Sequence, residues 1–136
     1  VPIGAMMCKE EVAVFVPGDH ASTFGGNPLV TSGVCVVIDE LVNNGLLQHV
    51  QEVGAYLTES LNKLKEQVDC ITDVRGIGLM QGVAITKVPK EVISKCIEKG
   101  MLIVSAGENV IRFVPPLIVT KEQIDEAVSI LKEALQ

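Results

Sequence analysis

Hydrophobic residues recur with helical spacing in four parts of this sequence of 136 residues. Asn27 followed by Pro28 is typical of a helix start, because Asn caps a helix and Pro suits its first position. Pro89 and Thr120 mark two further starts, and the spacing from Thr120 to Gln123 predicts a capping box. The hydrophobic periodicity therefore predicts helices over residues 28–43, 50–68, 89–99 and 120–135.

Shorter apolar runs, bounded by glycine and polar residues, predict strands. The spaced glycines between residues 71 and 85 favour a hairpin with a turn or bulge, and a second hairpin is expected around residues 106–109. The expected strands lie at residues 3–8, 12–16, 71–85 (two strands), 101–105 and 110–114. Helices and short strands together indicate a chain of mixed α and β structure.

The composition is unusually apolar, with 48% hydrophobic residues and a mean hydropathy of +0.40. No apolar run is long enough to span a bilayer, so we expect apolar faces that other protein covers. The sequence starts at Val1, within an apolar stretch and without a signal peptide, and reads as a fragment. The net charge of −6 and the presence of only two arginines argue against nucleic-acid and membrane partners.

The four cysteines are widely separated and form no C-x-x-C pair. Neither His20 nor His49 lies at a metal-ligand spacing from them, so we expect no metal site. Scattered thiols without a disulfide framework are typical of a reducing cytoplasm, and we expect them to serve as small buried hydrophobic residues. His49 is expected at the surface or at its boundary.

Residues 18–29 form a flexible loop that leads directly into the first predicted helix. The start of a helix presents unpaired N–H groups and partial positive charge, which suit an anion such as a phosphate. Ser22 and Thr23 add two hydroxyl donors, and Gly25 and Gly26 allow close approach of the backbone. The alternative from spacing alone is a surface loop followed by a capped helix.

Arg112 is the most informative single charge, because it stands inside an apolar strand pattern. Strand alternation gives it one face together with Val110 and Val114. A planar guanidinium suits bidentate binding of a substrate carboxylate. Two structural alternatives are an edge-strand arginine that points to water and an arginine paired with an internal Glu.

Three segments carry a resemblance to a known family. Residues 20–29 (HASTFGGNPL) resemble the H-[GA]-S-T-[FY]-G-G-N-P-L segment of the class III aminotransferases. Residues 110–117 (VIRFVPPL) resemble their [VIL]-[IL]-R-[FLI]-x-P-P-L motif, and residues 74–82 (VRGIGLMQG) resemble V-R-G-x-G-L-M-x-G. The three segments occur in the family's order, and the resemblance covers nearly the whole chain.

The resemblance implies roles for three residues. Thr23, with Ser22 beside it, matches the threonine that reaches across a homodimer interface to the phosphate of the partner's pyridoxal 5'-phosphate. Arg112 matches the arginine that binds the substrate carboxylate, and no substrate role is carried over to Arg75. The lysine that holds the cofactor would precede Val1, so we expect no catalytic residue in this chain, no transaminase activity of the chain alone and no retained cofactor.

The implied fold class is α/β with an α+β small domain, namely the C-terminal part of a fold type I subunit of the pyridoxal-phosphate transferases. We expect a small antiparallel sheet with helices on one face, plus a connecting helix. Residues 1–28 would be a remnant of the large domain, 29–69 connecting helices, and 70–136 the small C-terminal domain.

The implied reaction moves the terminal amino group of N-acetylornithine, or of a related ω-amino substrate, to 2-oxoglutarate in cytoplasmic arginine biosynthesis. Ornithine, succinylornithine and 4-aminobutyrate remain alternative amino donors. A different class of function also stays open, namely a stand-alone, non-catalytic module that binds an anion or a partner chain.

Overall fold

The structure is a computed structural model that describes residues 2–136, and it divides into two compact units between Asn44 and Gly45. Unit 1 contains a short 3-10 helix, η1 (Glu10–Val12), and helix α1 (Pro28–Val42). Unit 2 contains three helices and four strands. They are α2 (Leu46–Gln67), β1 (Ile71–Ile77), β2 (Met80–Ile85), α3 (Pro89–Glu98), β3 (Val104–Ser105), β4 (Val110–Phe113) and α4 (Lys121–Leu135).

The two strands predicted at residues 3–8 and 12–16 are wrong, because the structure has only η1 in this region. A strand needs a hydrogen-bonding neighbour, and an isolated hairpin is marginal in water. Among residues 2–44 no partner strand lies beside these apolar runs. Their composition favours extended backbone, but composition alone does not supply the pairing.

Helix α1 begins as the sequence predicts. The Asn27 side chain accepts a hydrogen bond from the Val30 N–H at 3.1 Å, and its own amide donates to the Phe24 carbonyl at 2.9 Å. The helix ends at Val42, and Gly45 then adopts a left-handed φ of 79°, which suits glycine. Both ends of this helix are therefore set by local residues.

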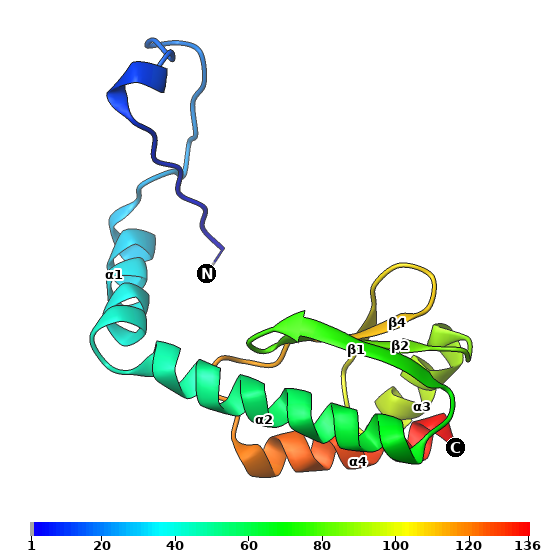
Figure 1. Cartoon of the computed structure of the whole chain (residues 1–136). Helices are drawn as coiled ribbons and strands as arrows, with labels where there is room; N and C mark the ends of the chain where they lie inside the picture. Colours follow the sequence, from blue (N-terminus) through cyan, green and yellow to red (C-terminus); the bar gives the residue numbers. More distant parts are fainter. Residues whose placement is uncertain (1) are drawn as a thin grey trace. The chain divides into compact units, whose positions relative to one another are not determined.

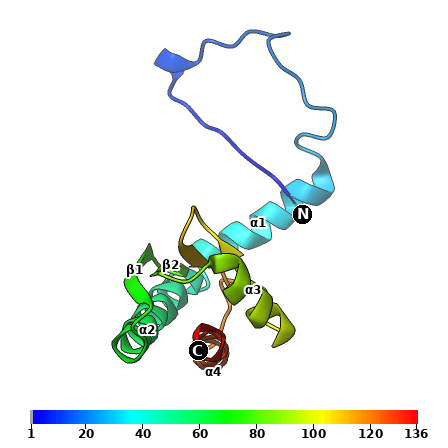
Figure 2. The ribbon, with the colours of Figure 1, turned by 90° about the vertical axis from the view of Figure 1, so that its right-hand side faces the viewer.

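Unit 2 contains a four-stranded antiparallel sheet with the strand order β1-β2-β4-β3, and helices α2, α3 and α4 lie on one face of this sheet (Figure 1, Figure 2). This arrangement confirms the predicted fold class. The predicted hairpin at residues 71–85 is present, whereas β3 is shorter than the predicted run. The compact units divide at Asn44 and Gly45, and the domain boundaries expected at 28 and 69 stay predictions.

The core of unit 2 lies between the sheet and its helices. Leu57 and Leu61 of α2 and Leu131 of α4 are almost fully buried, as are Ile111 of β4 and Val83 of β2. The capping box predicted at the start of α4 is confirmed, since the side chain and backbone of Thr120 and Gln123 bond reciprocally.

The turn between β1 and β2 packs directly against α2. Gly78 has a left-handed φ of 54°, and a Cβ placed on Gly54 of α2 would lie 2.7 Å from the Gly78 carbonyl carbon. Gln81 is 2% exposed and donates from Nε2 to the Gly78 carbonyl at 2.8 Å. These contacts fix the end of the hairpin, and with it the position of β2 in the sheet.

The cysteine prediction holds in part. Cys96 of α3 is buried, and this burial raises the pKa of its thiol, so it serves as a small hydrophobic residue as expected. Cys8 and Cys35 are exposed, contrary to the expectation, because none of residues 2–44 is buried.

Candidate functional sites

The first candidate site is the loop before α1 in unit 1. Ser22 and Thr23 lie next to each other and are exposed. The side-chain hydrogen bonds of this loop come from Asp19 and Asn27. Within residues 2–136 the hydroxyls of Ser22 and Thr23 make no hydrogen bond, so both are available to a ligand.

A cavity of about 450 Å³ lies beside this loop. Ser22, Gly25, Gly26 and Asn27 line one side of it, next to the start of α1. A Cβ on Gly25 would lie 2.9 Å from the Ser22 Oγ, so a larger residue there would displace this hydroxyl. Ser22 lines this cavity and Thr23 does not, so the cavity offers one hydroxyl and a helix N-terminus, both of which favour an anion.

The second candidate site is Arg112 on β4 of unit 2. The edge-strand alternative is wrong, because β4 lies between β2 and β3 in the sheet. The internal-pair alternative also fails in the described chain, since none of the ion pairs formed within residues 2–136 includes Arg112. Arg112 is exposed, and its neighbours Ile111 and Phe113 point to the core instead.

Arg75, the other arginine, differs from Arg112 because it forms an ion pair. Its Nη1 lies 2.8 Å from Asp73 Oδ2 on the same strand. This hydrogen bond, together with the positive charge of the Arg75 guanidinium, lowers the pKa of Asp73 below its ordinary value. The guanidinium of Arg75 is therefore partly satisfied, whereas that of Arg112 has no ion-pair partner within the described residues and can bind an external anion.

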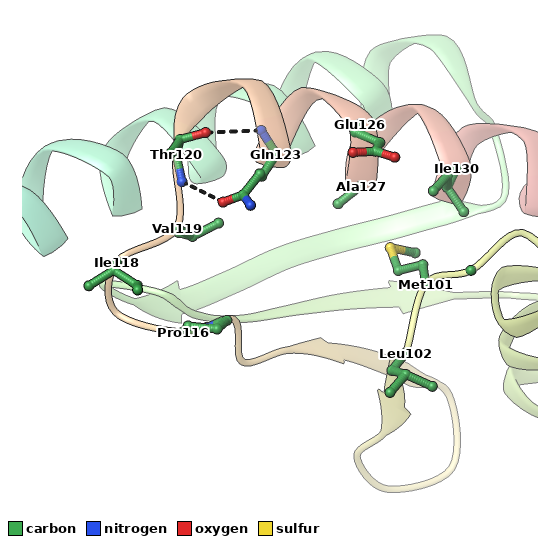
Figure 3. Close-up of a pocket in the computed structure, with 11 residues that line it drawn as sticks. Met101, Leu102, Pro116, Ile118, Val119, Thr120, Gln123, Glu126, Ala127 and Ile130 are labelled. Atoms are coloured by element: carbon green, nitrogen blue, oxygen red, sulfur yellow. Dashed lines mark hydrogen bonds between the residues drawn. The ribbon is translucent and has the colours of Figure 1, made fainter.

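A larger cavity, of about 590 Å³, lies on unit 2 between α4 and the segments 100–102 and 116–120 (Figure 3). Met101 extends toward α4 in this view, and Ala127 and Ile130 give the helix side an apolar lining. Among the described residues, Glu126 is the only charged one that lines the cavity. Neither Arg112 nor Arg75 lines it, so it is separate from the arginine site.

His49, expected at the surface or its boundary, is half-buried near the start of α2. Its Nε2 lies 3.0 Å from the Val119 carbonyl oxygen, so the ring links α2 to the segment that precedes α4.

In the described residues, no three side chains of His, Cys, Asp or Glu gather in a geometry for a metal ion. No single helix within residues 2–136 is both long enough and apolar enough to cross a membrane. Helices α1 and α2 meet these criteria only when they are taken together, as a pair that is bent at residues 43–45.

Residues 1–135 match the family described as "Aminotransferase class-III". Among curated proteins, the acetylornithine aminotransferase of Caldanaerobacter subterraneus subsp. tengcongensis is 48% identical over 98% of this chain and 34% of its own length. The acetylornithine aminotransferase of Clostridium acetobutylicum is 47% identical over 99% of the chain and 35% of its own length. The chain thus spans about a third of the length of the curated relatives it matches.

Solved structures show the same likeness. The acetylornithine aminotransferase of Elizabethkingia anophelis superposes with a TM-score of 0.78 at 32% identity, over 89% of this chain and 31% of that protein. The lysine aminotransferase of M. tuberculosis superposes with a TM-score of 0.80 at 28% identity, over 88% of this chain and 28% of that protein.

Proposed function

This chain belongs to the class III aminotransferases, and we propose that the full-length protein transfers the terminal amino group of N-acetylornithine to 2-oxoglutarate. The curated relatives that share almost half of its residues are acetylornithine aminotransferases, which supports this donor. The structural observation that carries the proposal is the guanidinium of Arg112, which lies on an interior strand and has no ion-pair partner among residues 2–136. We place the reaction in cytoplasmic arginine biosynthesis and the enzyme in a homodimer.

The loop before α1 fits the phosphate of pyridoxal 5'-phosphate, the cofactor that the family implies. The hydroxyls of Ser22 and Thr23 are free in the described chain and stand before the N-terminus of a capped helix. In the proposed homodimer these hydroxyls hold the phosphate of the partner subunit's cofactor. When bound, the cofactor supplies the electron sink for amino transfer, while the protein supplies orientation.

Arg112 binds and orients the carboxylate of the substrate. Its planar fork donates two parallel hydrogen bonds, which fix both the position and the rotation of a carboxylate. Fixing one end of the substrate holds the reacting amino group at the other end in one geometry. This pre-orientation removes part of the entropy cost of the reaction.

Kinetics and cofactor retention of the full-length homodimer test the two proposed roles. Arg112→Ala removes charge-assisted hydrogen bonds worth about 1.5–3 kcal/mol, so the KM for N-acetylornithine should rise about 10- to 100-fold. Arg75→Ala is the matched control, because it removes the only other guanidinium, which Asp73 already holds. Equal effects of the two variants would contradict the role of Arg112.

Thr23→Ala should weaken retention of the cofactor, measured as loss of its visible absorbance during dialysis. Thr23→Ser keeps the hydroxyl and should restore retention. If the alanine and serine variants lose the cofactor equally, the hydroxyl does not hold the phosphate.

A further inference from the structure

The register of the sheet aligns three residues in one row across β1, β2 and β4. Gly82 of β2 lies opposite Arg75 of β1 on one side and opposite Arg112 of β4 on the other. Directly opposite residues of antiparallel strands point to the same face. Arg75 and Arg112 are exposed, whereas the residues that flank the row along β2 and β4 (Gln81, Val83, Ile111 and Phe113) are buried, so the row lies on the face of the sheet away from the core.

The two arginines of this row are the only arginines in the chain, although the net charge is −6. Neighbouring strands are about 4.8 Å apart, so the backbones of Arg75 and Arg112 are about 10 Å apart with Gly82 between them. Asp73 already binds Arg75, so among residues 2–136 Arg112 is the arginine without an ion-pair partner. A carboxylate that approaches Arg112 from the side of β2 therefore passes over Gly82.

Gly82 leaves a space beside Arg112 that any other residue would fill. Cβ atoms of directly opposite residues lie about 4.5–5.5 Å apart, so a side chain at position 82 would contact the stem of Arg112. A Cβ on Gly82 would lie 3.1 Å from Val110 Cγ1 and 3.5 Å from the Arg75 carbonyl oxygen, so even alanine requires Val110 to shift by a few tenths of an ångström.

We propose that Gly82 is a specificity-determining residue that admits substrates whose carboxylate is attached to a substituted carbon. The substituent, such as the acylamino group of a 2-acylamino acid, occupies the space beside Arg112. A carboxylate attached to an unsubstituted CH₂ group leaves that space empty. This inference rests on the proposed function, because it assumes that Arg112 binds the substrate carboxylate.

The test compares two amino donors in the full-length enzyme carrying Gly82→Ala or Gly82→Val. N-acetylornithine has an acetamido group next to its carboxylate, and 5-aminopentanoate is the same chain without that group. Gly82→Ala should lower kcat/KM for N-acetylornithine about tenfold, the scale on which pockets discriminate one methylene, and Gly82→Val should lower it further. For 5-aminopentanoate the change should stay below about twofold, since its CH₂ group does not need the space.

Met80→Ala is the matched control, because Met80 lies on the same strand and face as Gly82 but opposite Ile77. It should leave the preference between the two donors unchanged. Equal losses for both donors in Gly82→Ala, or the same selective loss in Met80→Ala, would overturn the proposal. If Gly82→Val does not fold, Gly82→Ala and Gly82→Ser decide the question.

Calorimetric binding of two non-reacting ligands separates this inference from the proposed function. Gly82→Ala should weaken binding of 2-acetamidopentanoate about tenfold and leave binding of pentanoate nearly unchanged. An unreactive wild-type enzyme that shows this binding pattern would contradict the transaminase proposal and support the role of Gly82. An active enzyme in which Gly82→Ala changes the two dissociation constants equally would support the transaminase proposal and contradict the role of Gly82.

Discussion

At the scale of single residues, Tyr56 offers a direct measurement because it is the only tyrosine in the chain. Its hydroxyl donates to Asp125 Oδ1 at 2.6 Å, and Lys121 Nζ lies 5.4 Å from the centre of its ring. The hydrogen bond to Asp125, followed by partial burial, raises the pKa of Tyr56 above its ordinary value.

We therefore expect the phenolate absorbance of the chain to appear at a higher pH than that of free tyrosine, whose pKa is about 10. Asp125→Asn should lower this midpoint, and Glu122→Gln is a control on the same helix. Because the pKa is raised on folding, the stabilising contribution of the pair is complete below about pH 10 and is lost as the pH rises through the folded pKa. A midpoint that does not respond to Asp125→Asn would contradict the pairing.

The arginines show what a sequence can reveal about a candidate site. Arg112 stands out because an apolar strand pattern predicts burial, and burying a charge costs free energy unless the charge has a partner. Gly82 does not stand out, because a glycine in a strand is consistent with a bulge or a bend. Its place opposite Arg112 follows from the register of β2 and β4, which no local pattern specifies.

At the scale of elements, local signals predicted helices well. Asn27 and Thr120 cap α1 and α4 as expected, because a cap depends only on residues within one turn. The strands expected at residues 3–8 and 12–16 fail because pairing depends on a neighbour distant in sequence. The strands at residues 71–85 succeed because the glycine turn brings both partners together.

The contact between α2 and the hairpin gives a prediction for the element scale. A Cβ on Gly54 would lie 2.7–2.9 Å from backbone atoms of Gly78, and backbone does not yield as a flexible side chain does. Gly54→Ala should therefore lower the free energy of unfolding by about 1–3 kcal/mol, measured by urea denaturation.

The matched control is Gly33→Ala in α1, where an added Cβ meets nothing within 4 Å. Alanine is the better helix former by about 1 kcal/mol, so this variant should not lose stability. An equal loss of stability in both variants would show that the close approach of α2 to Gly78 is not the cause.

At the scale of the whole molecule, the two units differ in how their apolar residues are used. Every buried hydrophobic side chain of the described chain belongs to unit 2, from Val53 to Leu135. In residues 2–44 none is buried, and large apolar side chains such as Phe24 and Leu29 are more than 80% exposed. Hydrophobic burial is the dominant favourable term in folding, so unit 1 lacks the main source of stability that unit 2 has.

We expect residues 45–136 to fold without residues 1–44. This fragment retains the whole core and should show a single cooperative urea transition, with a midpoint close to that of the complete chain. Limited proteolysis of the 136-residue chain should cut first within residues 2–44, because exposed backbone without packed side chains opens at little cost. If instead the fragment unfolds at a much lower urea concentration, or proteolysis starts within the sheet, unit 1 stabilises unit 2. In that case the core of unit 2 would not be sufficient to hold Arg112 and Gly82 in their observed register.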